Sequence, residues 1–74
     1  MKVTVKLFAS FQLGRFEVEL REYPEQTAIG QIFQDLHIPA GEVGILLLNA
    51  VHAKPQQILK DGDVLAIFPL VGGG

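Results

Sequence analysis

The sequence predicts an α+β fold in which one helix packs across a single mixed sheet. Three observations predict it: two early segments alternate apolar and polar residues, a middle segment carries apolar residues at helical spacing, and two late segments are continuously apolar. Alternation is typical of strands with one buried face, and short apolar runs are typical of strands buried on both faces. We expect one domain, because 74 residues leave no room for a second.

The first two predicted strands cover residues 2–8 and 16–20, where β-branched and other apolar residues alternate with polar ones. Residues 9–14 form the loop between them, so the two segments are expected to pair as an antiparallel hairpin. The residues expected to face the core are Val3, Val5, Leu7, Phe16, Val18 and Leu20. Phe8 and Phe11, which flank the loop, could extend an apolar patch around residues 68–71 if they are exposed, but a core position is expected at least for Phe8.

A helix is predicted after the break at residues 23–26. Its apolar face consists of Ile29, Ile32, Phe33 and Leu36, which follow the i, i+3, i+4, i+7 pattern. Thr27 is the expected N-cap, and Pro39 marks the end of the helix. Gly30 lies in the first turn, where glycine costs about 1 kcal/mol relative to alanine. We interpret Gly30 as a point where the helix approaches the sheet closely.

Two further strands are predicted at residues 44–49 and 64–68, with a loop over residues 54–57 and a turn at Asp61-Gly62-Asp63. The last strand is apolar on both faces, which predicts a central place in the sheet. The helix acts as a crossover, so early and late strands can pair in parallel. This order is that of a β-grasp fold, with a mixed sheet of four to five strands over residues 1–71 and a flexible glycine tail over residues 72–74.

Composition argues against several classes of function. A net charge of −2 gives no electrostatic footprint for nucleic acid or for an anionic membrane surface. No metal site and no bound cofactor are expected, because the chain has no cysteine and two histidines, His37 and His52. The carboxylates Glu17, Glu19 and Glu22 have no accompanying base or nucleophile, so general acid–base catalysis is not supported. With no targeting segment recognisable, the expected compartment is the cytoplasm.

The end of the chain is the candidate functional segment. Gly72 and Gly73 have no side chains and can enter a channel too narrow for a Cβ. Gly74 would present an unhindered carboxylate, ionised at pH 7 with a pKa of about 3.5, which can attack the α-phosphate of ATP. The candidate partner contacts just before the glycines are Phe68, Pro69, Leu70 and Val71, for which simple strand packing is an even alternative. An inert terminus or an expression remnant is the alternative for the glycines.

The sequence resembles the ubiquitin-like sulfur carriers, represented by the small subunit of molybdopterin synthase (MoaD) and the thiazole-pathway carrier (ThiS). The resemblance extends nearly from end to end. It is carried by "LKDGDVLAIFP" at 59–69 leading into "VGGG" at 71–74, by "LFAS" at 7–10 and by "TAIGQIFQDLHIP" at 27–39. Two positions depart from the family pattern, Ala50 and His37, each where glycine is common.

The resemblance implies that the protein is a carrier and co-substrate and not itself an enzyme. An adenylating enzyme of the ubiquitin-activating type would use ATP to activate the Gly74 carboxylate, and a sulfur donor would displace AMP to leave a thiocarboxylate. The acceptor would be the large subunit of molybdopterin synthase or thiazole synthase. The "FP" before the tail and the longer first loop favour the former, and the triple glycine favours the latter. Two alternatives are a protein modifier conjugated to lysines and a non-covalent interaction module.

Overall fold

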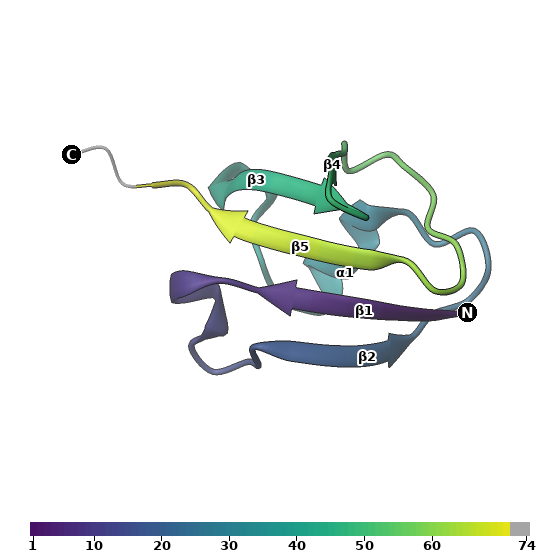
Figure 1. Ribbon diagram of the computed structural model, residues 1–74. Helices are drawn as coiled ribbons and strands as arrows, with labels where there is room; N and C mark the ends of the chain where they lie inside the picture. The colour runs from purple at the N-terminus through teal and green to yellow at the C-terminus, as the bar shows by residue number, and fades with distance from the viewer. Residues whose placement is uncertain (72–74) are drawn as a thin grey trace.

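The computed structural model describes residues 1–71, which form a five-stranded mixed sheet with one α-helix across one face (Figure 1). The elements are β1 (Lys2–Leu7), β2 (Val18–Glu22), α1 (Ile29–Asp35), β3 (Val43–Leu48), β4 (Val51–His52) and β5 (Val64–Pro69), with short 3₁₀ helices at Ala9–Gln12 and Ala40–Glu42. The strand order is β2-β1-β5-β3-β4. The predicted β-grasp fold is confirmed, and β4 is a short fifth strand.

The last strand, β5, is the centre of the sheet, as predicted. It pairs in parallel with β1 and antiparallel with β3. Parallel pairing requires a crossover connection, and α1 lies in the chain between β1 and β5. A central strand has neighbours on both edges and side chains on both faces, which explains its continuous apolar sequence.

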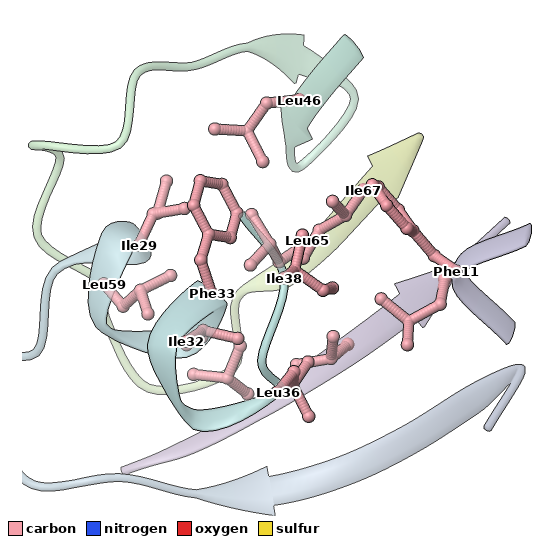
Figure 2. Close-up of a cluster of buried hydrophobic side chains, with 13 residues drawn as sticks. Phe11, Ile29, Ile32, Phe33, Leu36, Ile38, Leu46, Leu59, Leu65 and Ile67 are labelled. Carbon is pink, nitrogen blue, oxygen red and sulfur yellow. The ribbon is translucent and has the colours of Figure 1, made fainter. Parts of the chain in front are cut away.

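The core lies between the sheet and α1 (Figure 2). Val3, Val5 and Leu7 of β1 are fully buried there, as are Leu65 and Ile67 of β5. The helix face predicted from sequence packs against them: Ile29, Ile32, Phe33 and Leu36 are all buried. Because side chains alternate across a strand, the residues between these positions on β1 and β5 point to the opposite side of the sheet. We call that opposite side the open face.

The predicted orientation of β2 is wrong. Val18 and Leu20 are 57% and 61% exposed. In the β1–β2 register, Leu20 pairs with Thr4 on the open face, while Arg21 pairs with the buried Val3. A shift of one residue in register moves a whole strand's side chains to the other face, and alternation alone does not choose between the two. Phe16 precedes the strand and is half-buried at the edge of the core.

A polar cluster covers the helix-side face of β2 in place of the expected apolar residues. Arg21 forms ion pairs with Glu19 at 2.6 Å and with Asp35, at the end of α1, at 2.8 Å. Arg21 Nε also donates a hydrogen bond to the hydroxyl of Tyr23. Burial raises the pKa of Tyr23 above its ordinary value. Burial alone would lower the pKa of Arg21, but its hydrogen bonds to Tyr23 and Asp35 leave that pKa raised.

The start of the helix differs from the prediction in two respects. Thr27 is not the N-cap: it is buried, and its hydroxyl donates to the carbonyl oxygen of Pro24 at 2.7 Å. Ala28 takes the N-cap position, where its N–H donates to Gln31 Oε1. The predicted close approach of Gly30 to the sheet is not seen. Gly30 lies against the loop at residues 54–57, where its N–H donates to the carbonyl oxygen of Pro55 at 2.9 Å.

The two departures from the family pattern both occupy backbone conformations that favour glycine. The helix ends at Asp35, before Pro39, and His37 follows with a φ of 57°. Asn49 and Ala50 form the two-residue turn between β3 and β4, with φ values of 52° and 67°. Positive φ is strained for residues with a Cβ. By contrast, Gly62 meets the φ of 85° in the predicted turn before β5 without strain.

Candidate functional site

The candidate site lies where the chain leaves the sheet after β5. The backbone N–H of Leu70 donates to the carbonyl oxygen of Glu42 at 2.9 Å, just before β3 begins. Leu70 is 58% exposed and Val71 is 90% exposed. In Figure 1, this end of β5 lies beside the start of β3 and the turn that follows β1. The body therefore holds the chain as far as Leu70, and Val71 projects into solvent.

Two stacked phenylalanine rings form the centre of the site. The rings of Phe8 and Phe68 lie 4.0 Å apart between centroids, at an interplanar angle of 9°. Leu7 pairs with Ile67 in the parallel β1–β5 register, and both are buried, so the next residue on each strand points to the open face. The expected core position of Phe8 is therefore wrong. Phe11 is the buried phenylalanine, because the 3₁₀ turn that follows Phe8 brings it back to the core.

A shallow apolar groove runs along this end of the sheet. Its lining residues are Phe8, Ala9, Ser10, Ile45, Phe68, Pro69, Leu70 and Val71, and we call it the tail-base groove. None of these described residues carries a charge, and Ile45 is 43% exposed. The four predicted contact residues, Phe68 to Val71, all line it. Sequence reasoning missed Ile45, which pairs with Phe68 across the β3–β5 ladder.

A second hollow continues the apolar surface along the open face. It shares Phe8 and Phe68 with the tail-base groove and extends past Ala66 and Leu47 to the β3–β4 turn, with Lys6 at its edge. The exposed Leu20 of β2 lies on the same face. Contiguous exposed apolar surface on a small protein marks an interaction site. The geometry thus offers an apolar docking surface directly beside the point where the chain leaves the sheet.

The remaining sequence predictions concern groups that lie elsewhere. His37 and His52 line separate hollows on different parts of the molecule. Within residues 1–71 there is no group of three or more histidine, cysteine or acidic residues arranged to hold a metal ion. No helix in this part of the chain has the length and apolar character needed to cross a membrane. Gly72, Gly73 and Gly74, the predicted threading and reactive residues, lie outside the described residues.

Solved structures with the same fold cover nearly the whole chain. A putative molybdopterin converting factor subunit 1 from Pyrococcus furiosus has 26% identity and a TM-score of 0.76, with 96% of this chain and 99% of that chain covered. Subunit 1 in the complex of molybdopterin-converting factor subunits 1 and 2 from Helicobacter pylori has 27% identity and a TM-score of 0.67, with both chains fully covered. SAMP1 from Haloferax volcanii has 22% identity and a TM-score of 0.77 over both full chains, a likeness of fold.

Sequence comparison gives the family. No curated protein sequence matches this chain. The model of the ThiS family matches residues 5–74, a span that contains the second half of β1, all of the other strands and the helix, together with the glycines at 72–74. The same match includes the residues that line the tail-base groove. The chain therefore belongs to the ThiS family of small, ubiquitin-like sulfur carriers, which are carrier proteins and not themselves enzymes.

Proposed function

We propose that this protein carries sulfur on the carboxyl group of Gly74 and delivers it as the small subunit of a molybdopterin synthase. In the first step, a carboxylate oxygen attacks the α-phosphorus of ATP, and pyrophosphate leaves. Hydrosulfide supplied by a sulfur donor then attacks the acyl carbon of the resulting acyl-adenylate, and AMP leaves. The product is a thiocarboxylate. At the acceptor enzyme its sulfur forms a bond to the substrate, and water cleaves the acyl–sulfur bond, so that the tail returns to a carboxylate. All three steps take place in the active sites of partner proteins, which we expect in the cytoplasm.

The observation that carries this proposal is the apolar groove at the base of the tail. A partner protein must bind the folded body of a carrier while the carrier's last residues reach into the partner's active site. The stacked Phe8 and Phe68, with Ile45 beside them, provide an apolar binding surface next to the residue where the chain leaves the sheet. Aromatic residues are enriched at protein interfaces because they bury a large area at a low cost in conformational entropy.

The choice of acceptor rests on the solved relatives. Two of these solved relatives have more than a quarter identity: one is named a putative molybdopterin converting factor subunit 1, and the other belongs to a complex of subunits 1 and 2 of a molybdopterin-converting factor. These relatives favour the large subunit of molybdopterin synthase over thiazole synthase as the acceptor. The open face is the surface that we expect this large subunit and the adenylating enzyme to contact in turn.

Mass spectrometry tests the chemistry directly. The protein is incubated with ATP, a sulfide source and the ubiquitin-activating-type enzyme of its source organism. We expect the intact mass to rise by the difference between one sulfur and one oxygen atom, because one carboxyl oxygen is replaced. A variant with one alanine added after Gly74 serves as a matched control, since its fold is unchanged but its carboxylate lies one residue too far along the tail.

Two results would contradict the proposal. One is an unchanged mass with the true enzyme, and the other is full sulfur transfer by a chain that lacks Gly73 and Gly74. The thiocarboxylated protein is then mixed with candidate large subunits, and transfer to molybdopterin synthase but not to thiazole synthase is expected. Immunoblots for lysine-linked adducts test the alternative of a protein modifier, because a pure sulfur carrier forms none.

A further inference from the structure

Gly44 in β3 lies unusually close to the point where the tail leaves the body. A Cβ added at Gly44 would lie 2.7 Å from the carbonyl oxygen of Pro69, 2.9 Å from the Cα of Leu70 and 3.0 Å from its backbone nitrogen. All three atoms belong to the backbone, so no side-chain rotation can relieve the contact. Any residue larger than glycine would therefore displace the chain at Pro69 and Leu70.

The local pairing explains why the two strands approach so closely there. The β3–β5 register shifts between Val43, which pairs with Pro69, and Ile45, which pairs with Phe68. Gly44 is therefore the extra residue of a bulge, a position where glycine inside a strand allows another backbone to approach. The N–H of Leu70 donates to the carbonyl oxygen of Glu42 just beyond this bulge. The bulge and the hydrogen bond together fix the direction in which the chain leaves the sheet.

That direction matters because the remaining chain is short. Gly74 is the fourth residue after Leu70, so its carboxyl group lies at most about 14 Å from Leu70. A tilt of about 10° at Leu70 would move the far end of an extended tail by about 2 Å. Misplacement of a reacting group by about 1 Å can reduce a rate about a hundredfold.

We infer that Gly44 is a positioning residue for sulfur activation: it allows Leu70 to anchor on Glu42 and so aims the terminal carboxylate at the partner's active site. This inference rests on the proposed function. It separates two tasks among neighbouring residues. The open face docks the partner, and the bulge at Gly44 sets the direction of the tail.

The test compares Gly44→Ala with Gly41→Ala. Gly41 is a matched control, because a Cβ there would meet nothing within 4 Å and its φ is not positive. Thiocarboxylate formation is measured at several carrier concentrations with the activating enzyme, ATP and sulfide. For Gly44→Ala we expect kcat to fall by about tenfold or more while KM changes much less, because the stacked Phe8 and Phe68 at the centre of the docking surface lie before the displaced residues Pro69 and Leu70. Gly41→Ala should match the unmodified protein.

Hydrogen exchange gives a second readout that does not depend on the partner. The Leu70 amide should exchange slowly in the unmodified protein and in Gly41→Ala, and faster in Gly44→Ala, because the bond to Glu42 is lost. The amides of Leu65 and Ile67 should keep their protection in all three proteins. A general loss of stability would instead accelerate the exchange of all these amides together.

A second pair of variants applies if Gly44→Ala does not fold. Leu70→Pro removes the N–H that bonds to Glu42, and Leu70→Ala removes the side chain but keeps that N–H. Leu70 follows the last residue of β5, so neither change enters the ladder. A lower kcat for Leu70→Pro than for Leu70→Ala supports the inference, and equal values overturn it.

The outcomes distinguish the inference from the proposed function. If the unmodified protein and Gly41→Ala form no thiocarboxylate, the proposed function is wrong. Faster exchange of the Leu70 amide in Gly44→Ala would then show only that Gly44 allows the hydrogen bond between Leu70 and Glu42. If both form it and folded Gly44→Ala has the same kcat, the positioning role is wrong while the sulfur carrier stands. A rise in KM at constant kcat would also overturn the inference, because it would place Gly44 in docking.

Discussion

The two faces of the sheet carry similar apolar residues but differ in how far those residues are buried. On the helix side, Leu65 and Ile67 of β5 are fully buried beneath α1. On the open face, Phe68 of the same strand is only half-buried, Ile45 beside it is 43% exposed, and Leu20 at the edge is 61% exposed. Apolar residue types alone do not distinguish the faces. One face therefore forms the core that stabilises the domain, while the other leaves apolar surface exposed.

The contrast is sharpest between two adjacent residues, Ile67 and Phe68. Ile67 lies in the core on the helix side of the sheet, near Phe11 (Figure 2), and Phe68 stacks on Phe8 on the opposite side. A small domain has only a few kcal/mol of net stability. Leaving large apolar groups on a surface therefore requires a reason, and binding to partner proteins supplies one.

Truncation in the core has the largest expected effect. Ile67→Ala should lower the free energy of unfolding by about 2–5 kcal/mol, because it removes a buried side chain and leaves a cavity. Urea denaturation followed by circular dichroism measures this change. Phe68→Ala in the same assay should cost about 1 kcal/mol, since it mainly removes the stacking contact. If Phe68→Ala proved the more costly of the two, our assignment of the faces would be wrong.

Truncation on the open face should instead affect binding. Phe68→Ala should raise the KM for the activating enzyme about tenfold, because aromatic anchors in an interface contribute more than about 1 kcal/mol each. The kcat should change much less, in contrast to Gly44→Ala. Leu20→Ala is the control on the same face, at the edge strand β2 and outside the tail-base groove. An equal loss for both variants would mean that docking is not centred on the groove.

A change at the β3–β4 turn, at the end of the second hollow farthest from the tail-base groove, has the smallest expected effect. Ala50→Gly should raise the free energy of unfolding by about 0.5–1 kcal/mol: relief of a left-handed alanine is worth about 1–2 kcal/mol, and the greater freedom of glycine in the unfolded chain offsets part of it. Asn-Gly is also the preferred pair in two-residue hairpins. Gly62→Ala, at a φ of 85°, should act in the opposite direction. A loss of stability in Ala50→Gly would argue against the positive φ at this turn.

Much of the fold follows from local patterns. Alternation in β1, the helical spacing of Ile29 to Leu36, and the continuous apolar run of β5 each depend on residues close in sequence, and all three predictions are confirmed. The prediction that the glycine tail and the four residues before it form the functional segment rests on the same kind of local signal. The four predicted contact residues line one groove because residues 68–71 are consecutive at the end of β5 and just beyond it.

The positions that sequence reasoning missed depend on contacts between distant segments. The face to which Leu20 points follows from the register of β2 on β1, and the connection between them, residues 8–17, does not set that register by its length. The exchange of roles between Phe8 and Phe11 follows from the 3₁₀ turn in the same connection. A glycine within an apolar run is a signal for a bulge, so the sequence could have marked Gly44 as a bulge position. It could not have shown that the backbone of Pro69 and Leu70 lies against it.

The order of strands and helix and the central place of β5 can be derived from the sequence alone, because each follows from the period and length of a local run, while the reactive role of the chain's end stays a prediction. Which apolar residues remain exposed, and where the tail is anchored, follows from the assembled fold. Both depend on backbones that meet across the sheet: β2 against β1 at the edge, and Gly44 against Pro69 and Leu70 at the base of the tail. These contacts between backbones depend on the register of the strands, and register is a property of the assembled sheet and not of any one strand.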